Sequence, residues 1–166
     1  MTNLSIYDQL PEKVDLFQRY FPVFRTAMGM TADDLADVLD VTRTTIANIE
    51  NGRVKMQKIY ILAFMAVMQI YIDTGGNDII TFIVTSLING ATPPGIRPLT
   101  ESEQRRLGEI LEKARFKSGR KAGIAAGQKN VIEAYKNYIS NIGSLGLKRG
   151  AEFKVPDVMS MKWKNL

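Results

Sequence analysis

The chain has 166 residues, of which 45% are hydrophobic and 23% charged, a composition typical of a globular protein with enough apolar side chains for a core. Cysteine and histidine are both absent, and the acidic residues form no spaced cluster, so that we expect no disulfide, no metal, no cofactor and no enzymatic activity. The net charge is +5, but residues 1–99 carry 8 basic and 10 acidic side chains whereas residues 100–166 carry 14 and 7, which favours a polyanionic partner for the second half.

The first predicted helix contains an apolar stripe at spacings of three and four residues between Val14 and Phe24. Pro22 lies within this stripe and is expected to start or bend a helix there, because proline lacks a backbone N–H.

Two short helices are predicted next, from about Ala32 to Leu39 and from about Arg43 to Glu50. The first has Thr31 as its N-cap and Asp34 three residues later, a weaker version of the capping box. The second has Thr42 as its N-cap and stops at the Asn-Gly pair 51–52.

Two strongly apolar segments follow, at about Gln57–Ile72 and Ile79–Ile88. The part 59–72 is too short to span a bilayer and contains Gln69 and two tyrosines, so we predict a buried helix, with part of its surface serving either as core or as a dimer seam. The second segment is rich in β-branched residues, but it has no evident pairing partner and is also predicted to be helical. Because residues 1–10 do not resemble a signal peptide, we expect a cytoplasmic protein without a membrane partner.

A linker is predicted at residues 91–99, because Ala91–Pro98 contains three prolines and one glycine. Thr100 and Glu103 form a capping box that opens a helix to about Lys117, and a further helix is expected over Lys121–Asn141. Residues 153–155 are the one candidate for a short strand. We therefore predict an all-α fold with an N-terminal five-helix domain (1–90) and a basic, mainly helical C-terminal region (100–166).

The two short helices carry apolar residues where a tight helix–turn–helix needs them, on a face that points inward. These inward positions are Leu35, Leu39, Ala36, Val41, Ile46 and Ile49. On the outer face of the second short helix the remaining residues are nearly all able to form hydrogen bonds: Arg43, Thr44, Ala47, Asn48 and Asn51. A firmly anchored helix with short polar groups outside is what the major groove accepts, although a helical hairpin that binds no nucleic acid is the plainer alternative.

Over residues 14–70 the sequence resembles the Cro/repressor (XRE-like) helix-turn-helix family. The matching positions are Arg25, Thr31, Leu35, Ala36, Val41, Thr42, Ile46, Ile49, Glu50, Asn51 and Gly52. The resemblance implies a five-helix repressor-like fold, a structural pair of Arg25 with Glu50, base contacts by Arg43, Thr44 and Asn48, and a phosphate contact by Asn51. Arg53, Lys55 and Lys58 follow the same helix and are expected to add phosphate contacts.

The sequence departs from the family pattern at two positions. Ala32 stands where the family often has a glutamine that meets the DNA backbone, and Asp40 stands where the turn often has glycine. Asp33, Asp34 and Asp37 also make the first short helix acidic, which would repel phosphate. The module is therefore expected to depend on dimerisation or on the basic half for its affinity.

A second basic surface is predicted after the linker, where six basic residues occur without an acidic one: Lys113, Arg115, Lys117, Arg120, Lys121 and Lys129. A solvated basic helix face is the alternative interpretation. Three glycines recur there at positions 119, 123 and 127, which indicates a close helix–helix approach, a close approach of backbone to phosphate, or a flexible joint.

Two functions compete at this stage. The first is a sequence-specific transcriptional regulator, a bacterial or phage repressor that binds double-stranded DNA as a homodimer with the third helix in the major groove. The second is a protein-interaction factor, such as an antitoxin-like or host-takeover protein, that uses this fold and its basic half to bind protein or RNA. Under either function, residues 100–166 are available for dimerisation, for a protein partner or for additional DNA contact.

Overall fold

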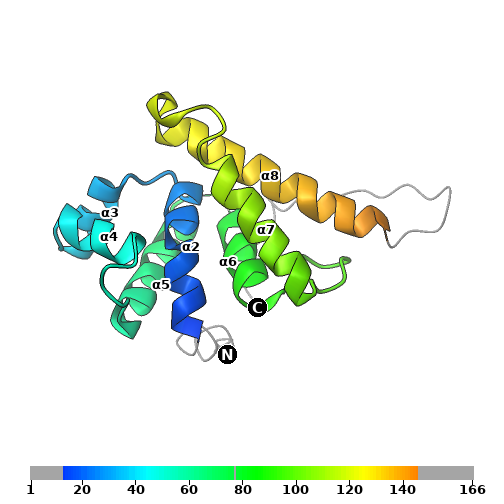
Figure 1. The fold of residues 1–166 in the computed structure, drawn as a ribbon, viewed down its shortest axis with the longest axis horizontal. Coiled ribbons are helices and arrows are strands. Elements are labelled where there is room, and N and C mark those ends of the chain that lie inside the picture. Colours follow the sequence, from blue (N-terminus) through cyan, green and yellow to red (C-terminus); the bar gives the residue numbers. More distant parts are fainter. Residues whose placement is uncertain (1–12, 77, 146–166) are drawn as a thin grey trace.

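The structure is a computed structural model that describes residues 13–76 and 78–145. Within these ranges it contains seven α-helices and a short 3-10 helix, and no strand (Figure 1). The prediction of an all-α fold is therefore confirmed. Residues 153–155, the candidate strand, lie outside the described residues.

The first three helices have the predicted order: α2 (Val14–Ala27), α3 (Ala32–Leu39) and α4 (Arg43–Glu50). Thr31 accepts the backbone N–H of Asp34 while the Asp34 carboxylate accepts the N–H of Thr31, so the predicted capping box is present. Thr42 caps α4 through the N–H of Thr45. Helix α2 continues through Pro22, so of the two effects expected of this proline, the start of a helix is excluded.

The two apolar segments form α5 (Lys58–Asp73) and α6 (Ile79–Asn89). The choice of helix over strand for α6 is confirmed, and its physical basis is burial, because every residue from 79 to 88 is buried. A helix that is apolar on all sides needs neighbours on all sides. Helix α6 ends at Gly90, whose φ of 76° places it in the left-handed region.

The last two long helices are α7 (Glu101–Ala114) and α8 (Ile124–Leu145). The predicted capping box of Thr100 and Glu103 opens α7. Helix α8 begins three residues after the predicted start at Lys121, because Gly123 adopts a φ of 89° that no right-handed helix allows. Helix α7 ends at Ala114, before the predicted end at about Lys117. Between Gly119 and Gly123, residues 120–122 form the 3-10 helix η2.

The linker is folded onto the rest of the chain. Arg97 donates two hydrogen bonds of 2.7 Å to the Glu103 carboxylate, and the N–H of Leu99 donates to the carbonyl oxygen of Gly90. The Arg97 guanidinium and then the backbone N–H of Thr100 lower the pKa of Glu103 to about 2. Ile96 and Leu99 are buried, so the linker covers one end of α6.

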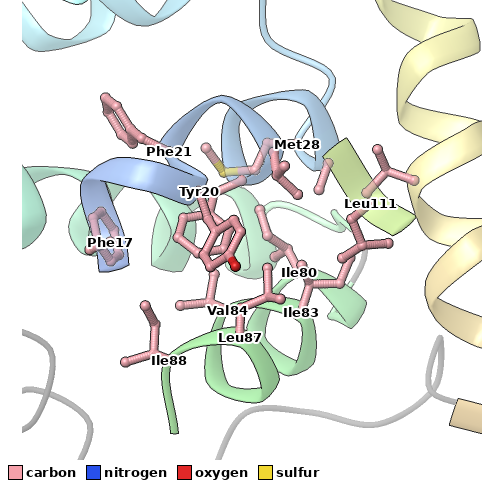
Figure 2. Packing of buried hydrophobic residues seen from close by; sticks show 14 of the residues in the cluster. Phe17, Tyr20, Phe21, Met28, Ile80, Ile83, Val84, Leu87, Ile88 and Leu111 are labelled. Atoms are coloured by element: carbon pink, nitrogen blue, oxygen red, sulfur yellow. The ribbon is translucent and has the colours of Figure 1, made fainter. Parts of the chain in front are cut away.

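One hydrophobic core is shared by the helices on both sides of the linker. Helix α2 packs against α6, α7 and α8, and α6 also packs against α7. Figure 2 shows Leu111 of α7 beside Ile80 and Ile83 of α6, with Tyr20 of α2 next to them. The basic second half therefore contributes side chains to the core of the N-terminal helices, which composition and charge had not indicated.

A second part of the core is aromatic. The Phe64 ring of α5 lies 5.2–6.3 Å from the rings of Phe17, Phe21 and Phe24 of α2, and all four side chains are fully buried. This cluster joins α5 to α2. It leaves the opposite face of α5 without a neighbour among the described residues, and Ile59 and Ile70 on that face are 65% and 64% exposed.

A buried hydrogen-bond network also connects the two halves. The Tyr135 hydroxyl of α8 lies 2.8 Å from the Ser86 hydroxyl of α6, and Ser86 donates to the carbonyl oxygen of Ala91. Burial raises the pKa of the Tyr135 hydroxyl, which therefore stays protonated.

Helix α7 approaches α2 closely at Gly108. A Cβ atom at this position would lie 2.3 Å from the Tyr20 hydroxyl oxygen and 2.6 Å from ring atoms of a side chain that is only 3% exposed. We therefore expect Gly108→Ala to lower the free energy of unfolding by about 1–3 kcal/mol in urea titrations. In a Tyr20→Leu background the same change should cost much less, and an equal cost in both backgrounds would contradict this contact.

None of the helices in the described ranges combines the length and the apolarity needed to cross a bilayer.

Candidate nucleic-acid interface

Helices α3 and α4 meet in a tight turn that apolar side chains hold together. Leu35, Ala36, Ile46 and Ile49 are buried, at exposed fractions of 0–3%. The turn passes through Asp40, whose φ of 55° and ψ of 46° are left-handed, a conformation that aspartate tolerates better than most residues. The orientation of α4 is therefore set by burial of its inner face.

The outer face of α4 carries the predicted base-contacting residues. Arg43 and Thr44 are exposed at the start of the helix. The Arg43 Nε atom lies 3.7 Å from the Asp33 carboxylate, but both side chains are mostly exposed, and such a pair contributes little to stability. Arg43 is therefore able to exchange Asp33 for an external acceptor at low cost.

Asn48 is less accessible than Arg43 and Thr44. It is half-buried and lines a small pocket beneath the segment that follows α4. Its carbonyl oxygen accepts the backbone N–H groups of Arg53 and Val54, which fold that segment back over the helix. Asn48 therefore lies at the rim of the exposed face.

The predicted phosphate-contacting residues lie together in and after the end of α4. Asn51 caps the helix, and its side-chain oxygen accepts the N–H of Arg53. Arg53, Lys55 and Lys58 are exposed, and no carboxylate pairs with them anywhere in residues 13–76 and 78–145. This segment is a cationic edge beside the outer face of α4.

Arg25 and Glu50 form a nearly buried, bidentate ion pair. Nε of Arg25 lies 2.5 Å from one Glu50 oxygen and Nη2 lies 3.1 Å from the other, while Nη1 donates to the carbonyl oxygen of Met30. Their side chains are only 9% and 15% exposed. The pair connects the end of α2 to the end of α4, so it is structural and offers no free charge to a ligand.

Gln18 is a positioning residue that sequence reasoning missed. Its side-chain amide donates to the carbonyl oxygens of Ile49 and Val54, and its side-chain oxygen accepts the N–H of Met56. These three bonds attach the end of α4 and the following segment to α2. The sequence held no signal for them, because the partners lie 31 to 38 residues away.

The six residues of the predicted second basic surface lie at different places in the structure. Arg115 and Arg120 line a pocket together with Arg43 and the start of α3. Lys113 and Lys117 line a different groove, between α7 and α8. Lys121 and Lys129 are exposed outside both.

The acidic residues of α3 differ in their surroundings. The backbone and then the side chain of Thr31 lower the pKa of Asp34, whose carboxylate is engaged in the cap. Asp33, Asp37 and Asp40 are exposed. The negative charge therefore lies along the outer side of α3, adjacent to the outer face of α4.

Comparison with protein families identifies the segment that contains these helices. Residues 24–63 match the family described as helix-turn-helix, which covers α3, α4, the end of α2 and the start of α5. Neither the curated proteins nor the solved structures gave a match to the chain. The match to this DNA-binding family does not extend to α6, α7 or α8.

Proposed function

We propose that the chain is a sequence-specific transcriptional regulator, because residues 24–63 match a helix-turn-helix family of DNA-binding proteins. The observation that carries the proposal is the outer face of α4. This helix is anchored by Ile46 and Ile49 and exposes Arg43 and Thr44 to solvent. It has the dimensions and the chemistry of a helix that enters the major groove.

Each residue of this face has a defined role in the proposal. Arg43 offers a planar fork of donors to the O6 and N7 atoms of guanine, and Asn48 offers a donor and an acceptor to adenine. Thr44 contacts a third base edge. Asn51, Arg53, Lys55 and Lys58 bind phosphates, which fix the register but carry no sequence information.

Selection of bound sequences from a random duplex pool tests this proposal. Against the recovered site, Arg43→Ala and Asn48→Ala should each weaken binding by about 1–3 kcal/mol, or about 5-fold to 150-fold, and relax the preference at one base pair. Arg106→Ala is the matched control, because Arg106 is a similarly exposed arginine in a weak ion pair, 3.6 Å from Glu109. Wild-type affinity in the Arg43 and Asn48 variants would remove the proposal.

We propose further that the chain acts as a homodimer that pairs through α5. The residues between 59 and 72 include no charged side chain, and Ile59, Leu62 and Ile70 on one face are 49–65% exposed. Apolar residues that are exposed along one side of a helix over three turns favour association with another surface. A second copy is the occupant that fits a DNA-binding protein, because two copies present two α4 helices to successive major grooves about 34 Å apart.

Sedimentation equilibrium tests the dimer. The wild-type chain should sediment as a dimer, and the double variant Ile59→Asp, Ile70→Asp as a monomer with an unchanged helical CD spectrum. Val38→Asp is the control, because Val38 of α3 is 55% exposed but lies outside this face. A wild-type monomer, both free and bound to its selected duplex, would contradict this part of the proposal.

Occupation of an operator by such a dimer blocks access of polymerase, so that a bacterial or phage repressor is the role we propose. The protein-interaction factor is the second candidate function. The acidic outer side of α3, with Asp33, Asp37 and Asp40, favours it, because these carboxylates repel phosphate. Failure of the wild-type chain to bind any duplex at low salt would select this second function.

A further inference from the structure

A pocket of about 340 Å³ lies between the helix-turn-helix and the connection from α7 to α8. On one side it is lined by Thr31 and Ala32, where α3 begins, and by Arg43 at the first position of α4. On the other side it is lined by Arg115 and Arg120. Side chains more than 70 positions apart in the sequence thus converge on one concavity.

The two arginines on the second side lack acidic partners. Arg115 is half-buried and donates from Nε to the hydroxyl of Thr26, and no carboxylate in the described part of the chain forms an ion pair with it or with Arg120. Burial and then the positive charge of Arg25 lower the pKa of Arg115, and they outweigh the opposite effect of the Glu50 and Glu112 carboxylates. A desolvated cation next to other cations gains energy from an external anion.

The aromatic ring of Phe116 supports both guanidinium groups. The Arg115 guanidinium lies 4.7 Å from the centre of this ring and the Arg120 guanidinium lies 5.4 Å from it. Cation–π contacts of this kind restrict a flexible arginine. The two cations are therefore held near each other before any ligand binds.

Glycines shape the same side of the pocket. Gly119, Gly123 and Gly127 all line it, and a Cβ atom at 119 or 123 would meet no atom within 4 Å, so that side chains there would extend into open space. At Gly127 a Cβ would lie 3.1 Å from Thr26 and 3.3 Å from the carbonyl oxygen of Arg115. Gly127 thus permits a close approach between helices. Gly119 and Gly123 leave the cationic pocket unobstructed.

We infer that this pocket binds a phosphodiester group of the duplex whose bases α4 contacts, with Arg115 and Arg120 as its ligands. This inference rests on the proposed function. Arg43 forms part of both the outer face of α4 and the pocket rim, so a DNA backbone that borders α4 passes beside the pocket. Paired guanidinium donors match the oxygen atoms of a phosphate. The contact replaces the one lost where Ala32 stands instead of glutamine, and it offsets the repulsion from the acidic α3.

The salt dependence of DNA binding by the full-length chain tests the inference, with the selected duplex as the probe. The variant Arg115→Gln, Arg120→Gln should weaken binding, and the slope of log K against log [salt] should become shallower by about 0.9, the value for one phosphate contact. The matched control is Lys113→Gln, Lys117→Gln, which removes the same charge from the groove between α7 and α8. Equal changes in both double variants, or no change in the arginine variant, would overturn the inference.

A second experiment replaces one backbone phosphate of the duplex at a time with a neutral methylphosphonate. At one position next to the site read by α4, this replacement should weaken wild-type binding but leave the arginine variant unaffected. Absence of such a position would overturn the inference. Arg120→Gln alone separates binding from folding, because Arg120 is exposed and its guanidinium contacts the exposed ring of Phe116. These results are distinguishable from failure of the proposed function, in which the wild-type chain binds no duplex.

Discussion

Replacement of Glu50 by alanine is expected to lower the free energy of unfolding by about 3–5 kcal/mol, because it leaves the buried Arg25 charge without its carboxylate partner. The Arg25 side chain is 9% exposed, and among residues 13–76 and 78–145 its one further acceptor is the carbonyl oxygen of Met30. Urea denaturation followed by far-UV CD measures this loss. Loss of the pair also removes the link between the end of α2 and the end of α4.

Two further variants show whether burial is the cause. Replacement of both Arg25 and Glu50 by leucine should recover much of the loss, since a buried ion pair exchanged for apolar side chains costs little. Glu109→Ala removes the carboxylate of an exposed pair with Arg106 and should change stability by about 0.5 kcal/mol or less. A loss at Glu50 as small as that at Glu109 would contradict the buried pair.

A fragment that ends at Leu99 is expected not to fold cooperatively, although it contains the whole helix-turn-helix. The reason is that α7 and α8 cover α2 and α6 with side chains that are 0–1% exposed: Leu107, Leu111, Val131, Tyr135 and Ile139. Removal of these helices exposes apolar surface on α6, where residues 79–88 are all buried. Thermal unfolding followed by CD should show a broad, non-cooperative transition for the fragment and a sharp one for the full chain.

A point variant gives the same comparison without truncation. Leu107→Ala in the full chain should cost about 2–5 kcal/mol, because it creates a cavity between α7 and the N-terminal helices. Lys113→Ala, at an exposed position of α7, is the control and should have little effect. A Leu99 fragment that unfolds as cooperatively as the full chain would show that the second half is not required for the core.

The core shared by both halves supports the DNA-binding role proposed for the second half. Because α8 packs on α2, the basic connection between α7 and α8 has a defined place beside α3. A flexible basic tail would add affinity for any polyanion, whereas a fixed pair of arginines adds it only in one register of the duplex. The role proposed for Arg115 and Arg120 therefore depends on the same core that the fragment lacks.

The local elements of this protein follow from short stretches of its amino-acid sequence. Thr31, Thr42 and Thr100 predicted the starts of α3, α4 and α7, because capping depends on residues within one helical turn. The apolar spacing in α3 and α4 predicted which face points inward, since helical periodicity also acts over short distances. The helix-turn-helix could therefore be predicted from the sequence.

Features that depend on residues far apart in the sequence became evident from the packed structure alone. It brought Arg115 and Arg120 next to Arg43 and separated them from Lys113 and Lys117, and it joined Gln18 to the segment after α4. It also showed that α7 and α8 of the basic second half pack against the N-terminal helices. These outcomes depend on how whole helices pack, and packing is set by the shapes of surfaces contributed by distant segments, which no short-range pattern encodes.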